Sequence, residues 1–459
     1  MRHRLSALFA LAFAFAASEA RADDTVHRLT LDDALKLSDE AHPALETATK
    51  KEAAAQARVG IAKTDAIPKV GAVLQVNRST GNAVPGATFA MQGIPNVAGP
   101  PGASRLGSGT WQTAAGVTAS WNVLDLVRMS ADVDAAESEV NVSRAETKVT
   151  RLAVASETID SYYALGQAHA VVDAADESEK RLQSFHDVVA AQVGQKLKPD
   201  ADLARADSEL AAAQVAVARA KLGLNIASTR LAAAIGKPEW NVDVAKESRP
   251  NLPEMPPPKG KTHPEIALYE ETAKAADARA SAARLDAYLP RIDLLGAAWL
   301  RGGGYVLNGG PNSGTGDGIV PDTPNWAIGA VVSWAPTDIA RGEAKARAEN
   351  ANAAVAKAKA KEISQSLDTA DTAARQGLKS ALDVAATTTT EVTAAKRAVE
   401  LANARYSTGN ASIVEVLDAE RVLAAAERDE ALARAEAWRA AAAVMRANGD
   451  VAPILRTGG

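Results

Sequence analysis

The sequence has no cysteine and few aromatic residues. With no Cys in 459 residues, disulfide bonds, thiolate metal ligands, a cysteine nucleophile and lipidation of an N-terminal cysteine are all excluded. Phe, Trp and Tyr make up only 4% of the chain, whereas 47% of it is apolar and alanine dominates that share. This composition is typical of long, closely packed helices rather than of one bulky core.

An excess of positive charge and a catalytic motif are also missing. Lys and Arg number 51 against 56 Asp and Glu, so the net charge is -5 and no basic surface is expected to bind nucleic acid. The 6 His residues show no metal-ligand spacing, and there is no G-x-S-x-G elbow. His42 and His263 each precede a proline suited to the first turn of a helix, which indicates a structural role. We therefore expect no enzyme activity, no cofactor and no metal site.

Long apolar runs are absent after the first residues. Residues 5–17 are apolar and follow a basic start, and Ala20 and Ala22 supply the small side chains of a cleavage site. This pattern predicts a secretory signal peptide over 1–22, whose apolar part is short for a membrane span. The rest of the chain is expected to be exported.

What the sequence does contain is an internal duplication. At an offset of 213 residues, GVTASWNVLDLVR meets GAVVSWAPTDIAR with five identities, which are hard to obtain by chance because tryptophan is among them. The identical positions are Gly116, Ser120, Trp121, Asp125 and Arg128, which meet Gly329, Ser333, Trp334, Asp338 and Arg341. A second shared segment runs from His-Pro through an alanine-rich stretch to another proline, at an offset of 221 to 222. Two copies of one structural unit are therefore expected.

Each copy begins with a helix and a β-hairpin. The helix is expected to end at Pro68 or Pro290, because proline cannot continue a helix and favours extended geometry in the residue before it. The hairpins are predicted at about 69–122 and 291–335, each with a Gly/Pro-rich loop and with tryptophan at both ends of its second strand. Strands of about ten residues with terminal aromatic side chains are typical of membrane barrels.

Each copy continues with a long helical hairpin, about 125–236 and 338–449. Proline is absent from most of both stretches, and apolar residues recur at multiples of seven, which indicates coiled-coil-like packing. A helix of roughly 70 residues is on the order of 100 Å long, far longer than a globular domain needs.

The expected organisation is therefore a duplicated unit with four strands and two long helical hairpins per chain. The boundaries are 1–22 for the signal peptide, 23–236 for the first repeat, 237–262 for a Pro-rich linker, 263–450 for the second repeat and 451–459 for a C-terminal tail. Four strands leave edge N–H and C=O groups that lipid cannot satisfy, so other copies must close the barrel. Two copies would give a filled eight-stranded barrel, and three would give twelve strands and a lumen.

The duplicated segments, the SW-x3-D-x2-R junction and the stretch RYSTGNASIVEVLDA resemble the TolC family of outer-membrane channels over essentially the whole mature chain. The resemblance implies a homotrimer in the cell outer membrane, with a 12-stranded membrane β-barrel in lipid and a long periplasmic α-helical barrel. It also implies that the protein is the exit duct of a tripartite efflux pump or type I secretion system. Its partners would be a periplasmic adaptor (membrane fusion protein) and an inner-membrane transporter.

The resemblance further implies a gate at the periplasmic turns of the helical hairpins. Acidic side chains in the second turn match positions that point into the closed end of the tube, and the first turn offers two more. The candidate constriction residues are Glu415, Asp418, Asp200 and Asp202, the candidate gate contacts are Arg405 and Tyr406, and the candidate turn residues are Gly194 and Gly409.

Two other interpretations remain open from the sequence. Glu415 and Asp418 could simply lie on a solvated helix face, as charged pairs on helices usually do. The whole chain could be a soluble periplasmic coiled-coil adaptor or scaffold. That alternative does not explain why both halves insert a hairpin flanked by tryptophan at the same point.

Overall fold

The computed structural model describes five stretches of the chain, which form two units. The described residues are 23–80, 109–244, 252–257, 263–303 and 319–451. The unit that we call the helical unit comprises residues up to Thr49, Glu146–Ala267 and the chain from Glu362 onward. The sheet unit comprises Lys50–Ala145 and Leu268–Lys361. The predicted signal peptide lies outside the described residues.

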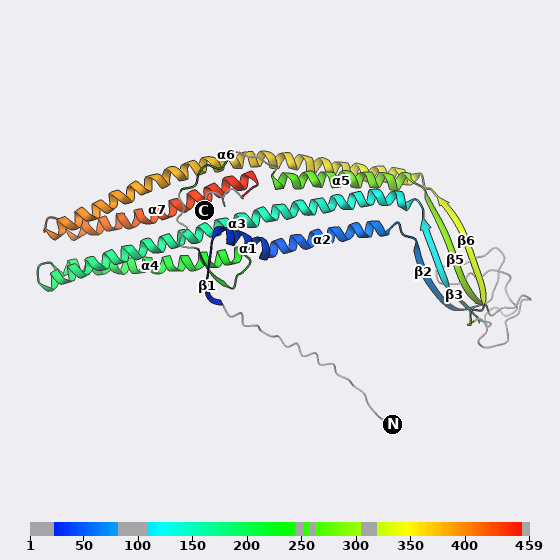
Figure 1. Cartoon of the computed structure of the whole chain (residues 1–459), viewed down its shortest axis with the longest axis horizontal. Helices are drawn as coiled ribbons and strands as arrows, with labels where there is room; N and C mark the ends of the chain where they lie inside the picture. Colours follow the sequence, from blue (N-terminus) through cyan, green and yellow to red (C-terminus); the bar gives the residue numbers. More distant parts are fainter. Residues whose placement is uncertain (1–22, 81–108, 245–251, 258–262, 304–318, 452–459) are drawn as a thin grey trace, which may run out of the picture. The chain divides into compact units, whose positions relative to one another are not determined.

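Two long helical hairpins and four long strands confirm the expected fold class (Figure 1). The helices are α1 (Leu31–Ala41), α2 (Pro43–Thr64), α3 (Asp125–Gly194), α4 (Asp200–Ala234), α5 (Pro264–Tyr288), α6 (Thr337–Ser407) and α7 (Ile413–Asn448). The strands are β1 (Asp23–Leu29), β2 (Lys69–Thr80), β3 (Gly109–Asn122), β4 (Trp240–Val244), β5 (Arg291–Gly303) and β6 (Thr323–Ser333). Helices α3 and α6 are 70 and 71 residues long and each contribute to both units.

Small side chains on one side of the long helices explain how they pack. In the helical unit, α6 and α7 meet through a cluster of alanine and branched residues, namely Val392, Ala395, Val399, Leu423 and Ala426. Alanine lets helices approach closely and has the highest helix propensity. In the part of the chain that the structure describes, none of the helices is long and apolar enough to cross a membrane.

The core of the helical unit contains a small sheet that the sequence analysis did not predict. Strands β1 and β4 pair in parallel, so the region expected as a Pro-rich linker includes a strand. Around this pair gather buried residues of α1, α3, α4 and α7, and the rings of Tyr163 and Trp438 stack with their centroids 5.2 Å apart. Because the two strands are about 200 residues apart in sequence, no local pattern indicated their pairing.

The sheet unit holds a four-stranded antiparallel sheet in the order β2-β3-β5-β6 (Figure 1). Side chains paired in register share one face of a sheet. Through its central rows one face is almost wholly apolar: Val70, Ala72, Leu74, Val76, Ala115, Val117, Ala119, Leu294, Gly296, Ala298, Leu300, Trp326, Ile328, Ala330 and Val332. The other face carries charged and amide groups, namely Lys69, Gln75, Asn77, Arg291, Asp293, Arg301 and Asn325.

The apolar face is exposed rather than packed. Leu74 is 75% exposed, Ile328 83% and Val332 70%. The mainly apolar strands of this face therefore have no protein core beneath them, unlike the sheets of water-soluble domains, which bury an apolar face. Strands β2 and β6 lie at the two edges of this sheet.

A half-buried ion cluster links α3 to α7 in the helical unit. Arg181 Nε donates to Glu420 at 3.1 Å, and Arg181 Nη2 donates to Glu427 at 2.8 Å. The Glu420 side chain is only 4% exposed, and this burial raises the pKa of its carboxyl although Arg181 opposes the shift. Arg181 thus compensates two carboxylates that the helix packing has removed from water.

Replacing Arg181 by Met keeps the aliphatic bulk and removes the charge, so we expect the free energy of unfolding to fall by about 3 kcal/mol near neutral pH. A carboxyl whose folded pKa lies above its unfolded pKa destabilises the folded state at high pH, and that penalty disappears as the pH falls. The loss in Arg181→Met should therefore shrink between about pH 7 and pH 5. Thermal unfolding followed by circular dichroism at both pH values measures it.

Arg428→Met is the matched control, because Arg428 is exposed and pairs with its neighbour Asp429 on α7. That control should change the unfolding free energy by less than about 0.5 kcal/mol. Equal effects of the two substitutions at neutral pH would show that the Arg181 cluster contributes nothing specific.

Candidate functional site

The two turns that join the long helices have the same length and hydrogen bonds. In the first turn, the Leu197 N–H donates to Gln192 O at 2.9 Å and the Lys196 N–H donates to Val193 O at 2.8 Å. In the second turn, 213 residues later, Asn410 and Gly409 donate to Arg405 O at 2.8 Å and Tyr406 O at 3.1 Å. Both are Schellman motifs, which end a helix at a residue of positive φ.

The residue of positive φ is a glycine in the second turn only. Gly409 has φ 76°, as its predicted role in the turn requires, but its counterpart is Lys196 with φ 60°. Gly194 is the last residue of α3, directly before the first turn, and it has no positive φ. The backbone of Lys196 is sterically strained, because a residue with a Cβ atom is disfavoured in the left-handed region.

Equal turns fix which residues correspond between the two hairpins. Helix α4 starts at Asp200 and α7 at Ile413, again 213 residues apart. Asp202 is therefore the counterpart of Glu415, and the counterpart of Asp418 is Arg205. The first turn thus carries a basic residue where the second carries an acidic one.

The predicted acidic residues of the second turn are paired with arginines in the described chain. Arg405 Nη1 donates to Glu415, and Arg405 Nη2 donates to Asn410 O at 3.2 Å, which links α6 to the start of α7. Asp418 lies 3.4 Å from Arg421 on its own helix, and Arg421 also pairs with Glu209 of α4. Asp200 is exposed and Asp202 half-buried at the start of α4.

Tyr406 is a core residue within the single chain. It is 3% exposed and belongs to a cluster with Val189, Ile413 and Val416, and Lys198 Nζ lies 4.3 Å from its ring centroid. Burial and the nearby Asp202 carboxylate raise the pKa of its hydroxyl. Within the described residues that hydroxyl has no hydrogen-bond partner. The constriction and gate roles of these residues stay predictions.

The tips offer charge but no ligand set for a metal. Among the residues that the structure describes, no three His, Asp or Glu side chains come together as metal ligands. The predicted acidic, arginine and tyrosine side chains of the turns can create a local electrostatic potential, form ion pairs and hydrogen-bond to a neighbouring surface.

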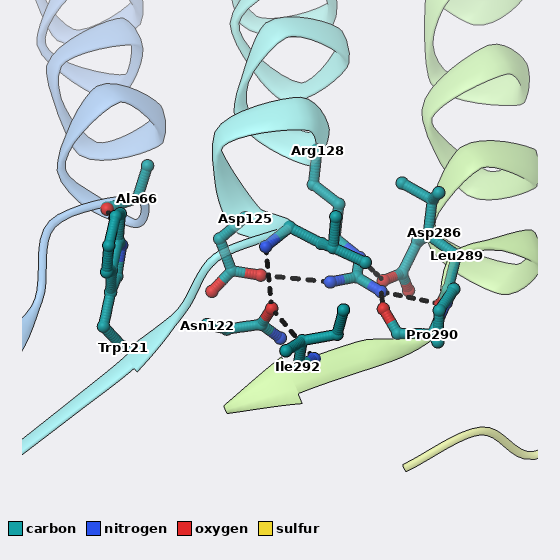
Figure 2. Close-up of polar contacts among 10 residues, drawn as sticks. Ala66, Trp121, Asn122, Asp125, Arg128, Asp286, Leu289, Pro290 and Ile292 are labelled. Atoms are coloured by element: carbon teal, nitrogen blue, oxygen red, sulfur yellow. Dashed lines mark hydrogen bonds and ion pairs between the residues drawn. The ribbon is translucent and has the colours of Figure 1, made fainter. Parts of the chain in front are cut away.

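A second polar site lies in the sheet unit, where β3 continues into α3 (Figure 2). Arg128 Nη2 donates to Leu289 O at 2.8 Å and to Pro290 O at 3.0 Å, at the C-terminal end of α5. Its Nη1 donates to Asp125 at 3.2 Å, and its Nε lies 3.1 Å from the Asp286 carboxylate. Arg128 is 8% exposed, so it ties the first repeat to the second through a nearly dehydrated guanidinium.

Further hydrogen bonds near Arg128 connect the strand ends and helix ends at this junction. Trp121 Nε1 donates to Ala66 O at 3.0 Å, which fixes the last residues of β3 against the end of α2 (Figure 2). Asn122 Oδ1 accepts from the Leu124 N–H at 3.1 Å, and the Val123 N–H donates to Ile292 O of β5 at 3.0 Å. Trp121, Asp125 and Arg128 are identical in the two repeats, but their contacts were not predicted from the sequence.

Comparison with known proteins agrees with this architecture. Residues 34–237, which include the whole of β2, β3 and the first long helical hairpin, match the family described as outer membrane efflux protein. No match to the chain is found among curated proteins.

Several solved structures have the same fold at low sequence identity. CusC has a TM-score of 0.72 at 16% identity, with 92% of each chain covered. The CmeC outer membrane channel of Campylobacter jejuni has a TM-score of 0.71 at 18% identity, covering 93% of this chain and 88% of that one. The MtrE outer membrane channel of Neisseria gonorrhoeae in its open state has a TM-score of 0.65 at 18% identity, covering 92% and 89%.

Four strands that cross-pair two repeats, together with two long helical hairpins, give the chain the same fold as these outer membrane channels. Within residues 34–237 the sequence matches the outer membrane efflux protein family, and over most of its length the chain shares the fold of these outer membrane channels.

The two turns allow a reciprocal test of the Schellman geometry. Lys196→Gly should raise the free energy of unfolding and Gly409→Lys should lower it, each by about 1 kcal/mol, because a side chain is strained at positive φ and glycine is not. The measurement is the thermal midpoint of each variant by circular dichroism.

Gly223→Ala is the control for glycine substitution in general, since it lies inside α4 with no atom near the added Cβ and should be slightly stabilising. A Gly409→Lys variant as stable as the parent would contradict the left-handed turn.

Proposed function

We propose that three copies of the chain close a 12-stranded barrel in the outer membrane and form the exit duct of a tripartite efflux pump or type I secretion system. Substrates delivered by an inner-membrane transporter and a periplasmic adaptor would pass through it without chemical change. The duct is passive, and its narrowest part lies at the turns between the long helices.

One observation carries this proposal: the four-stranded sheet has an exposed face that is almost wholly apolar through its central rows, and it has two edge strands. Lipid is the solvent in which such a face is stable, and a closed barrel is the only sheet form that satisfies its edges there. Three copies give a barrel wide enough for a lumen, into which the face with Arg291, Asp293 and Arg301 would point. At the loop end of the apolar face, Arg78 lies 5.6 Å from the Trp111 ring centroid, a pairing suited to a membrane boundary.

The helices supply the rest of the proposed duct. Helices α3 and α6 begin within three or four residues of the ends of β3 and β6, so a ring of strands leads directly into a ring of helices. Helices α3 and α6 are 70 and 71 residues long, about 100 Å each, which suits a tube across the periplasm. There it would meet the adaptor and transporter.

The gate is proposed at the two turns. Glu415 and Asp418 of three subunits would gather six carboxylates around the axis, with Asp202 as the first-repeat counterpart of Glu415. The pairs Arg405–Glu415 and Arg421–Asp418 hold these side chains in place within each chain. A ring of carboxylates favours cations and repels anions, and salt screens this effect beyond about 10 Å at 0.1 M.

The proposal that one face of the sheet contacts lipid is tested by introducing a lysine on that face or on the opposite face. Ile328→Lys should reduce the amount of folded protein in the outer membrane strongly, because a lysine facing lipid near mid-bilayer costs about 2–4 kcal/mol. Ala327→Lys places the same charge on the other face of the same strand, where the lumen is proposed, and should fold at the parental level. The amount of folded protein in the membrane fraction of each variant is measured from the difference in gel migration between heated and unheated samples.

The Ala327→Lys variant and the parent should be trimers in detergent by light scattering corrected for bound detergent. A stable monomer, or equal tolerance of lysine at both positions, would contradict the barrel.

The carboxylate ring is tested in planar bilayers at low ionic strength. Replacing Glu415 and Asp418 together by Ala should reduce the cation preference measured from the reversal potential in a salt gradient, because the ring loses its six charges. The isosteric pair Glu415→Gln and Asp418→Asn should give the same reduction, which separates charge from shape.

Tyr406→Phe serves as a control for selectivity, because it removes only a neutral hydroxyl and should leave the reversal potential unchanged. It also reports on the gate: a higher open probability supports a bond from this hydroxyl to a neighbouring subunit, and an unchanged one restricts Tyr406 to packing. Unaltered selectivity in both carboxylate variants would place Glu415 and Asp418 on a solvated outer face.

A further inference from the structure

Arg128 makes a set of contacts that its counterpart in the second repeat does not make within one chain. Arg341 is the counterpart of Arg128 at the offset of 213, and Asp338 is the counterpart of Asp125. Arg341 lies 3.8 Å from Asp338, but its side chain is 75% exposed, compared with 9% for Arg128. The same residue type at the same place in the repeat is therefore dehydrated in one half and solvated in the other.

The partners of Arg128 also have counterparts, and these are exposed too. Asp286, Leu289 and Pro290 at the end of α5 correspond to Asp65, Ile67 and Pro68 at the end of α2, by the offset of 221 to 222. Asp65 and Pro68 are exposed and Ile67 is 57% exposed, whereas Leu289 and Pro290 are half-buried. Within one chain, Arg341 therefore does not contact a helix end as Arg128 does, and the C-terminal end of α2 does not contact an arginine as the end of α5 does.

The order of the strands explains why Arg341 and the end of α2 lack these contacts within one chain. Arg128 follows β3 and reaches the helix that precedes β5, the strand next to β3 in the sheet. Arg341 follows β6, which has no neighbour on its outer side within the chain, and α2 precedes β2, which is the opposite edge. When copies join β6 to β2, Arg341 of one copy comes to the end of α2 of the next.

We propose that Arg341 of each subunit binds the C-terminal end of α2 in the neighbouring subunit, through the carboxylate of Asp65 and the backbone carbonyl oxygens of Ile67 and Pro68. This inference rests on the proposed trimer. It assigns a specific, directional contact to the seam between subunits, at the boundary between the strands and the helices. A guanidinium fits this site because its fork of N–H groups matches carbonyl and carboxylate acceptors together.

The charges beside the contact differ in a way that favours association between separate chains. At the junction inside the chain, Asp132 stands near Asp286 and Asp65, and burial together with these like charges raises the pKa of its carboxyl. Its counterpart is Lys345, one helical turn after Arg341. The seam would therefore bring two cations, Arg341 and Lys345, toward the end of α2, where the internal junction has one cation and an additional carboxylate.

The seam cannot copy the internal junction in full. The bond from the Val123 N–H to Ile292 O has no equivalent, because the counterpart of Val123 is Pro336, which has no N–H group. Asn122, whose side chain accepts from Leu124, is replaced by Ala335. Side-chain contacts from Arg341 thus carry more of the seam than Arg128 carries inside the chain.

Cross-linking in this cysteine-free chain tests the proposal. A variant with Asp65→Cys and Arg341→Cys is treated with a short bifunctional maleimide and analysed on denaturing gels. We expect covalent dimers and trimers. The matched control carries Arg128→Cys and Asp286→Cys, which should link within one chain and migrate as a monomer, with the linked peptides found by mass spectrometry.

Charge exchange gives a second, independent test. Arg341→Glu should lower the temperature at which the trimer dissociates in detergent, and adding Asp65→Arg to the same chain should restore at least half of that loss. Light scattering reports the oligomeric state of every variant. Trimers that neither cross-link at 65 and 341 nor recover on charge exchange would overturn the Arg341 contact and leave the proposed duct standing, whereas a monomeric parent protein would overturn both.

Discussion

The hydrogen-bonding groups along the edges of β2 and β6 are the constraint on which the rest of the structure depends. In water an exposed edge strand is tolerable, but in lipid each unsatisfied N–H or C=O costs several kcal/mol. The chain does not close its own sheet, since the order β2-β3-β5-β6 leaves both ends open. Its apolar face forbids the alternative of an open sheet in water. In the proposed trimer, assembly is therefore a condition of folding for the sheet unit, and the helices that follow each strand would inherit the symmetry of that assembly.

Because the chain is a duplication, each type of strand, helix and junction occurs twice in it. Junctions between strand and helix occur twice per chain, and the arginine at each junction has the same position in its repeat. In the proposed trimer only one of the two junctions lies within a chain, and the second differs from it at positions such as Pro336 and Lys345. The repeats have also diverged at the other end of the long helices, where Lys196 occupies the turn position of Gly409. Equal backbone geometry has thus been kept while the side chains took different tasks.

Much of the fold could be predicted because its signals are local. Pro68 and Pro290 mark where helices give way to strands, and long stretches without proline mark α3 and α6. The two faces of the sheet were harder to assign, because Val73, Leu295 and Val331 put apolar residues on the polar face and weaken the alternation. The parallel pair β1–β4 was missed since each strand is short and needs a partner far away in sequence.

The site was less predictable than the fold for a physical reason. Glycine content suggested Gly194 as a turn residue, but the Schellman hydrogen bonds place the positive φ two residues later, where lysine tolerates the strain. The pair Arg405–Glu415 joins residues ten positions apart across a turn, and Arg421–Glu209 joins two hairpins. Such pairs depend on tertiary packing. Helical spacing therefore found the acidic residues but not their partners.

The matched turns of unlike sequence have a consequence for anything that docks on the mouth of the proposed duct. Three chains would present six hairpins of equal height, but they alternate between the Asp202–Arg205 type and the Glu415–Asp418 type. A docking ring of six identical protomers would meet two chemically different surfaces, and its members would have to bind in two modes. A ring of three, or one built as three pairs, would find every contact alike.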